Sequence, residues 1–154
     1  MSDQLVRLIP SDPYFRVTER QAQEALRLIR QSIRADGIEL RMQETPMFID
    51  SRENMTSISC PCCRQLLDFG WWGDAMDKAY ETDFMDLSVQ LPCCGAKSTL
   101  QDLIYDFPCA FASFELEVRN PESDRRPDAR KPEDMLKQLE ELLGIPMRVI
   151  YAYC

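Results

Sequence analysis

The chain has 154 residues, of which 45% are hydrophobic and 29% charged, a composition that predicts a globular domain and excludes a disordered or fibrous chain. Its formal charge of -8 disfavours nucleic acid as a partner, because binding to phosphates depends on Lys and Arg displacing counterions. No apolar run approaches the roughly 20 residues that span a bilayer, and residues 1–10 lack the features of an export signal. We therefore expect a cytoplasmic protein that does not enter membranes.

The first third of the chain predicts a strand, a helix and a second strand. Residues 5–9 form a short apolar run before Pro10, which cannot donate to a strand ladder. Thr18 and Gln21 have the spacing of a capping box, and apolar residues then recur at helical intervals toward Gly37, the expected left-handed stop of the helix. Residues 38–42 alternate apolar and charged side chains, as a half-buried strand does.

The last third repeats this order of elements. Residues 114–118 alternate as a strand would, and Asn120 and Pro121 end the pattern. Pro132 suits the first position of a helix, and apolar residues at helical spacing follow as far as Gly144. Residues 147–153 are rich in strand-forming side chains and predict a final strand.

Between these thirds, residues 59–112 form a different kind of sequence. They contain eight acidic but only three basic side chains, six of the seven cysteines and both tryptophans. We interpret them as an insertion into an α+β core made of residues 1–58 and 113–154. Two strand–helix–strand halves predict a ferredoxin-like split βαβ (βαββαβ) fold, a four-stranded antiparallel sheet with two helices on one face. The alternative is an α+β fold with the same elements in another order.

Cysteines are concentrated at two places in the insertion. The first is Cys60-Pro61-Cys62-Cys63 and the second is Pro92-Cys93-Cys94-Gly95. This arrangement resembles a zinc ribbon, in which two tight Cys-x-x-Cys-Gly turns present four thiolates to one metal. The resemblance covers residues 57–112 and assigns Cys60, Cys63 and Cys94 to ligand positions. Arg64 stands in place of the first turn's glycine, and Leu91 in place of the second turn's first cysteine.

With no histidine in the chain, a structural Zn²⁺ site would consist of cysteines alone. Cys93 is the expected fourth ligand, with Cys62 and Cys109 as alternatives, and Cys154 is expected to take no part. Two other interpretations remain. The cysteines could be buried apolar residues, or Cys60 and Cys63 could form a redox dithiol similar to the glutaredoxin site. That motif belongs at the start of a helix, whereas residues 64–70 are more typical of a hairpin arm.

A second candidate site follows the first cysteine turn. Trp71 and Trp72 precede an acidic run that includes Asp74 and Asp77. Tryptophan is enriched in binding hot spots and clustered carboxylates attract cations, so these residues predict a surface for a basic protein partner. Alternatively, the tryptophans cover the small module and the carboxylates form the solvated face of a helix over residues 75–80, with Asp74 as its N-cap.

The sequence offers little for catalysis, since it lacks histidine, a Gly-x-Ser-x-Gly motif and a phosphate-binding loop. The motifs Cys60-Pro61-x-Cys63, Trp71-Trp72, Pro92-Cys93-Cys94-Gly95 and Tyr105-Asp106-Phe107-Pro108 occur together in this chain. In these motifs the chain resembles a family of small bacterial proteins to which no activity is assigned, and that resemblance implies no chemistry. We expect a non-enzymatic zinc-binding protein that acts by protein–protein interaction, for example an immunity-type or regulatory protein. The alternatives are a zinc-ribbon module associated with nucleic acid or transcription, and a thiol-disulfide redox protein.

Overall fold

The computed structural model describes residues 3–51, 56–122 and 130–153. These residues form a mixed α+β structure with three α-helices, which confirms the expected class. In chain order the elements are β1 (Gln4–Pro10), α1 (Glu19–Ser32), β2 (Gly37–Ile49), β3 (Ile58–Ser59), α2 (Phe69–Tyr80), β4 (Ser88–Gln90), β5 (Lys97–Thr99), β6 (Ile104–Tyr105), β7 (Ala110–Arg119), the 3-10 helix η2 (Pro132–Met135), α3 (Leu136–Leu143) and β8 (Met147–Tyr153).

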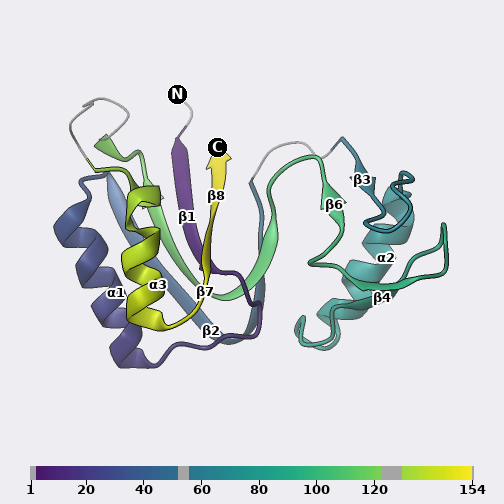
Figure 1. The fold of residues 1–154 in the computed structure, drawn as a ribbon, viewed down its shortest axis with the longest axis horizontal. Helices are drawn as coiled ribbons and strands as arrows, with labels where there is room; N and C mark the ends of the chain where they lie inside the picture. Colours follow the sequence, from purple (N-terminus) through teal and green to yellow (C-terminus); the bar gives the residue numbers. More distant parts are fainter. Residues whose placement is uncertain (1–2, 52–55, 123–129, 154) are drawn as a thin grey trace.

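The main sheet has four strands in the order β2-β7-β1-β8, and every neighbouring pair is antiparallel. Leu8 in β1 lies opposite Leu116 of β7 and Val149 of β8. Helices α1 and α3 lie side by side against one face of this sheet (Figure 1). Alternate strand residues such as Val6, Leu8 and Leu116 bury themselves beneath the helices, as the period-two pattern predicts.

The first helix begins as predicted but ends early. Thr18 Oγ1 accepts the Gln21 amide at 3.1 Å, and Gln21 Oε1 accepts the Thr18 amide at 3.0 Å, which confirms the capping box. The prediction that Gly37 stops the helix is wrong, because α1 ends at Ser32 and Ile33 adopts an extended conformation. This early end lets the Ile33 side chain bury itself in the core, while Gly37 begins β2.

The last helix matches its signals more closely. Pro132 begins the 3-10 turn η2, and Gly144 follows α3 with φ 73°, the left-handed conformation expected of a C-terminal glycine. Leu139 and Leu143 are the buried residues of α3 and face the core. Within the described ranges, no helix has both the length and the apolar character required to cross a membrane.

On the face of the sheet away from α1 and α3, charged side chains are buried. The side chains of Arg7, Glu115 and Glu117 are at most 7% exposed. Arg7 Nη1 donates to Glu115 Oε2 at 3.2 Å, and Arg41 bonds both glutamates, with its Nε 2.6 Å from Glu115 Oε1. The strand alternation was predicted correctly for these glutamates, but not their burial in an ionic network.

The two long strands β2 and β7 reach beyond the sheet and carry the cysteine-rich segment. Their register shifts between Met42 and Met47, and beyond that point Phe48 lies opposite Phe111. Phe111 is fully buried in an apolar cluster with side chains from residues 58–105, and Phe48 packs against the same cluster. The cysteine-rich segment therefore shares its apolar core with the end of the β2–β7 pair, on the far side of the sheet from α1 and α3 (Figure 1).

Glu115→Gln tests the buried network. It removes the nearest carboxylate of the buried Arg7 and leaves it only Glu117 at 3.9 Å and Asp50 at 4.0 Å, so we expect the free energy of unfolding to fall by about 3 kcal/mol, measured by urea denaturation. The control is Glu24→Gln, which breaks an exposed ion pair with Arg20 and should cost less than about 0.5 kcal/mol. Equal losses in the two variants would contradict a special role for the buried network.

Candidate metal centre

Two turns with the same backbone hydrogen bonds present the cysteines. In the first, the Cys60 amide donates to the Gln65 carbonyl at 2.9 Å and the Arg64 amide to the Cys60 carbonyl at 3.0 Å. In the second, the Leu91 amide donates to the Ala96 carbonyl at 2.8 Å and the Gly95 amide to the Leu91 carbonyl at 2.9 Å. Position by position, Cys60 thus corresponds to Leu91, Cys63 to Cys94 and Arg64 to Gly95.

Each turn reverses the chain through a left-handed residue. Gly95 has φ 73° and Arg64 has φ 68°. Glycine adopts this conformation freely, whereas a residue with a Cβ is strained in it. Arg64 in place of glycine therefore adds backbone strain to the first turn, but the turn keeps the same shape as the second turn. In that turn the amides of Cys62 and Cys63 point at Cys60 Sγ, at 3.3 and 3.4 Å.

The two turns face each other, and four of their sulfurs converge. The Sγ atoms of Cys60, Cys63, Cys93 and Cys94 all lie within 4.8 Å of one another. Cys60 Sγ is 3.8 Å from Cys94 Sγ, and Cys63 Sγ is 3.3 Å from Cys93 Sγ. A tetrahedral site with Zn–S bonds of about 2.3 Å places its sulfurs about 3.8 Å apart. This group could hold a metal ion, as the resemblance to a zinc-binding module implies.

The second turn places its two cysteines of the cluster at different positions from the first turn. Leu91 fills the place that corresponds to Cys60 and is buried, 1% exposed, in the apolar cluster. Cys93 reaches the sulfur cluster from the position that corresponds to Cys62. Cys62 itself is exposed and lies outside the group of four. The structure therefore brings together the four cysteines that the sequence put first.

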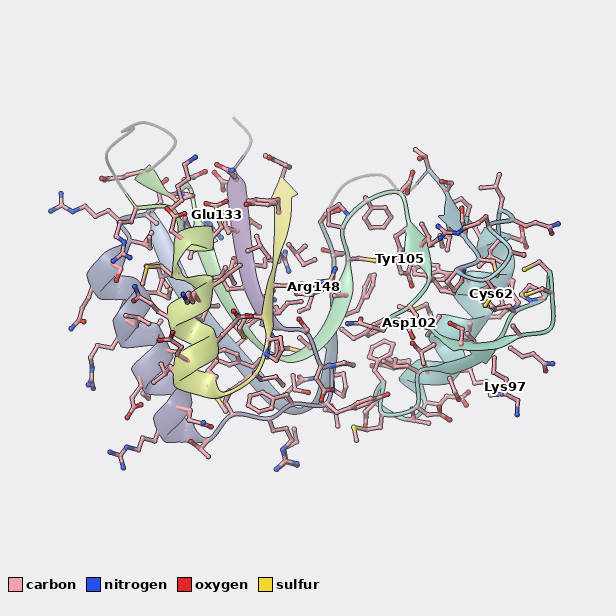
Figure 2. The ribbon with its side chains drawn as sticks, viewed as in Figure 1. Cys62, Lys97, Asp102, Tyr105, Glu133 and Arg148 are labelled. Carbon is pink, nitrogen blue, oxygen red and sulfur yellow. The ribbon has the colours of Figure 1, made fainter. Side chains whose placement is uncertain are left out.

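Cys109 lies elsewhere, in a cleft of about 400 Å³ that is also lined by Tyr105 and Arg148. Figure 2 shows Tyr105 on the side of the cysteine-rich segment that faces the sheet and Arg148 at the sheet, whereas Cys62 lies toward that segment's far end. Burial raises the pKa of the Cys109 thiol to about 12, and Arg148 offsets only part of that rise. Cys109 is thus a buried neutral thiol. Cys154 lies outside the described residues.

Two of the clustered thiols, Cys60 and Cys93, have pKa values shifted in opposite directions. Burial raises the pKa of Cys60, but bonds from the amides of Cys63 and Cys62 and from the neighbouring thiols outweigh it and bring the pKa to about 6. Burial and thiol neighbours raise the pKa of Cys93 to about 12. Cys60 therefore ionises more readily than Cys93, and a metal ion bound by both sulfurs would have to displace the proton of Cys93.

Helix α2 packs within the cysteine-rich module, residues 59–112, and begins earlier than predicted. Asp68 is its N-cap and accepts the Trp71 amide at 3.3 Å, so the prediction of Asp74 as N-cap is wrong. Asp68 is followed by Gly70 and Gly73, two glycines that favour a loop when only the sequence is considered. Burial of the following aromatic face outweighs the low helix propensity of glycine.

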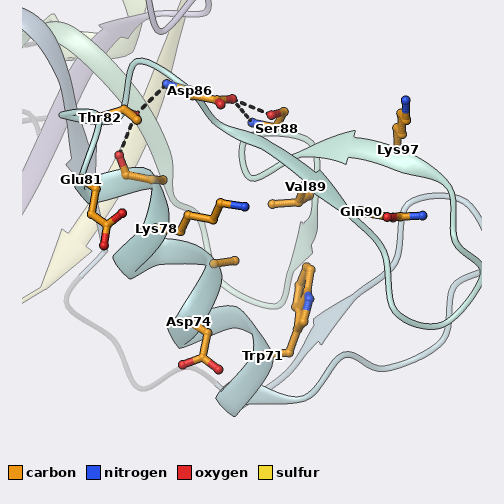
Figure 3. Close-up of a pocket in the computed structure, with 12 residues that line it drawn as sticks. Trp71, Asp74, Lys78, Glu81, Thr82, Asp86, Ser88, Val89, Gln90 and Lys97 are labelled. Atoms are coloured by element: carbon orange, nitrogen blue, oxygen red, sulfur yellow. Dashed lines mark hydrogen bonds between the residues drawn. The ribbon is translucent and has the colours of Figure 1, made fainter.

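The predicted partner residues separate onto different sides of α2. Trp71 and Asp74 line a groove between α2 and β4, shown in Figure 3. Trp72 instead turns to the module interior, where its Nε1–H donates to Tyr105 Oη at 3.2 Å and its ring contacts that of Phe48. Asp77 is exposed and does not line the groove.

Several groove residues were missed by sequence reasoning. They are Ala75, Lys78 and Ala79 on α2, and Ser88, Val89 and Gln90 on β4. Trp71, Asp74, Ala75 and Lys78 have helical spacing, which would have identified the α2 side of the groove had the helix been predicted to begin at Phe69. For β4, a strand of three residues, no periodic signal is long enough to detect.

The context of Cys60 and Cys63 differs from that of a dithiol at a helix start. After Cys63 the chain pairs back with β3, where the Leu67 amide donates to the Ile58 carbonyl at 2.8 Å and Leu66 bridges Ser59. Helix α2 begins only at Phe69, after this short hairpin. The helix dipole therefore does not act directly on the cysteines, as it does in redox motifs of that type.

Comparisons with protein-family models, with curated proteins and with solved structures gave no match to this chain. Function must be inferred from the residues of the site and the surfaces beside it.

The strained turn at Arg64 gives a testable prediction. Arg64→Gly removes the Cβ from a left-handed position, so we expect it to stabilise the cysteine module by about 1 kcal/mol, measured by urea denaturation followed through tryptophan fluorescence. Arg64→Ala is the matched control, because it removes the charge and keeps the Cβ, and it should bring no such gain. A gain of the same size in both variants would attribute the effect to the side chain rather than to the backbone.

Proposed function

We propose that the chain is a non-enzymatic metal-binding protein in which Cys60, Cys63, Cys93 and Cys94 hold a structural Zn²⁺, and that it acts by binding a basic protein partner. The observation that carries the metal proposal is the convergence of four thiols from two matched turns within 4.8 Å. All-cysteine tetrahedral sites are closed, since protein ligands fill every position. Such a site leaves no place for a substrate or an activated water, which supports a structural role.

We infer that residues 1–58 and 113–154 form a ferredoxin-like core and that residues 59–112 form a zinc-ribbon-like insertion. The antiparallel strand order β2-β7-β1-β8 with two helices on one face supports the split βαβ arrangement. The apolar cluster around Leu67, Leu91 and Leu100, which Phe48 and Phe111 join from β2 and β7, supports an insertion that packs on the end of these two strands. β7 begins at Ala110, so the insertion joins the core through a strand that belongs to both.

The partner proposal is supported by charge. Residues 59–112 carry eight acidic and three basic side chains. Four thiolates around a divalent cation form a centre whose net charge is also negative. Asp74 and Asp77 are exposed on α2, and Glu81 is exposed at its C-cap. Complementary charge steers and orients a partner, so a basic protein surface is the expected complement. An immunity-type protein that covers the basic active site of a toxin would fit this description.

A thiol-disulfide function is the second candidate. Two observations favour it, the pKa of Cys60 at about 6 and the 3.3 Å separation of the Cys63 and Cys93 sulfurs. Oxidation of the cluster would compete with metal binding, because a disulfide sulfur is no longer a thiolate ligand. A single determination of metal and thiol content distinguishes the two candidates.

The native protein should contain one zinc per chain by elemental mass spectrometry, and chelation should expose about four further thiols. Cys60→Ser and Cys94→Ser should each lose the metal and unfold the module, which tryptophan fluorescence reports because both tryptophans lie in α2. Cys62→Ser is the control within the same turn and should retain the metal.

Two outcomes would contradict this proposal. Stoichiometric zinc in both Cys60→Ser and Cys94→Ser would show that other thiols hold the ion. A metal-free protein with a disulfide in the cluster would instead support the thiol-disulfide candidate.

The partner proposal predicts that reversing the charge of Asp74, Asp77 and Glu81 to lysine abolishes the capture of basic proteins. Capture by the unaltered protein should weaken as salt is raised, because exposed charges are screened. A control triple on the core, Glu39→Lys, Glu44→Lys and Glu141→Lys, makes the same charge change at other exposed positions and should capture as well as the unaltered protein. Equal capture by both triples, or capture of nucleic acid alone, would contradict the proposal.

A further inference from the structure

A groove of about 760 Å³ runs between α2 and β4, on the acidic side of the module. Its walls hold Trp71, Ala75, Ala79 and Val89, which are apolar and at least half-buried. Three carboxylates and two amines surround them, from Asp74, Glu81, Asp86, Lys78 and Lys97. Figure 3 shows β4 between β5 and the open space beside α2, with Trp71 and Val89 reaching toward that space.

The edge of β4 that faces away from β5 is unpaired. Among the described residues, β4 and β5 form a sheet of only two strands. The Leu100 amide donates to the Leu87 carbonyl and the Leu91 amide to the Ala96 carbonyl, so the alternation of an antiparallel ladder makes Val89 and Ser98 the hydrogen-bonded pair between them. The main-chain groups of Ser88 and Gln90 therefore point away from β5.

One of these outward groups already has a partner within its own loop. The Ser88 amide donates to Asp86 Oδ1 at 3.0 Å. The amide and carbonyl of Gln90 and the carbonyl of Ser88 remain directed outward, with the spacing that a further strand would pair with. β4 is short, with three residues, and none of them is a charged residue or a proline that would block pairing along this edge.

We infer that this groove binds an extended segment of a basic partner protein, which adds to the free edge of β4 as a third strand beneath α2. The inference rests on the proposed function and specifies how the partner is held. Strand addition beside a helix obtains its affinity from main-chain hydrogen bonds and its specificity from pockets for alternate side chains.

The groove determines the chemistry of the segment. Alternate side chains of an added strand point to opposite faces, so one set meets the apolar wall formed by Trp71, Ala75 and Val89. The other set points outward near the rim, where Asp74 and Glu81 are exposed. Asp86 bonds Ser88 and is committed to the loop. Lys78 and Lys97 line the same groove, so the preference for a basic segment comes from the acidic excess of residues 59–112, eight acidic against three basic side chains, and from the exposed Asp74 and Glu81. The segment therefore alternates apolar residues with Lys or Arg.

The experiment selects random linear peptides from a display library on the metal-loaded, full-length protein. We expect the enriched peptides to alternate apolar residues with Lys or Arg. Methylating single backbone amides of a selected peptide should weaken binding about tenfold at every second residue and leave the residues between unaffected, because only alternate amides face β4. Absence of enriched basic peptides, or a methylation effect without this period, would overturn the inference.

Variants of the protein provide the second arm. Gln90→Pro removes an outward N–H that the β4–β5 ladder does not use and should weaken the selected peptides about tenfold, whereas Gln90→Ala keeps the N–H and should bind within about twofold of the unaltered protein. Ala75→Lys fills the groove from the helix side and should abolish binding. Gly73→Lys adds the same charge to α2 at a position whose Cβ meets nothing within 4 Å, and should not weaken binding as Ala75→Lys does.

The two proposals fail differently in this experiment. If the triple charge reversal at Asp74, Asp77 and Glu81 weakens the selected peptides while Gln90→Pro and Ala75→Lys do not, the acidic module binds basic partners but not by strand addition. If no variant weakens binding, the groove and the proposed function are both contradicted. Zinc content and the urea midpoint of each variant show that it is folded, and the methylation series requires no variant of the protein.

Discussion

The constraint that ties the cysteine-rich module together is the convergence of four thiols from two turns of the chain, which adds to a small apolar core. β3 and β6 have two residues each and β4 and β5 three each, well below the length at which a hairpin is stable alone. α2 has 12 residues and includes Gly70 and Gly73. Cys60 has a pKa of about 6 and Cys93 a pKa of about 12, so a metal bound by both thiolates would have to displace the proton of Cys93. The metal proposed for this site would close the module and contribute directly to its folding free energy.

The main sheet supplies part of the apolar core of the cysteine-rich module. Phe48 and Phe111 extend the apolar cluster of the module from β2 and β7, and Trp72 completes it through its ring contact with Phe48 and its bond to Tyr105. On the same side of the sheet, Arg7, Glu115 and Glu117 are buried together rather than solvated. Removing one member of such a network is costly, because the remaining charges stay buried without compensation. The core and the module are therefore coupled through the two strands that they share.

Local signals predicted the elements whose structure is decided locally. The capping box at Thr18 and the left-handed glycine at Gly144 depend on a few adjacent residues, and both are confirmed. The start of α2 was missed because Gly70 and Gly73 favour a loop, while the burial of aromatic residues around them is a property of the folded module. The fourth cysteine was ambiguous in the sequence for a similar reason. Whether Cys93 or Cys62 reaches the cluster is decided by the burial of Leu91 in the place corresponding to Cys60.

The metal centre and the groove share their framework. Gln90, the last residue of β4, is followed directly by Leu91, which opens the second cysteine turn, and Trp71 follows the N-cap of α2. If the proposed metal fixes that turn, it would also hold the edge of β4 in place and reduce the conformational entropy that a partner segment would have to remove. Coupling between two binding events is reciprocal, since each must change the affinity of the other by the same factor. A partner held along β4 would therefore retain the proposed metal more firmly, and loss of the metal would weaken the binding of the partner.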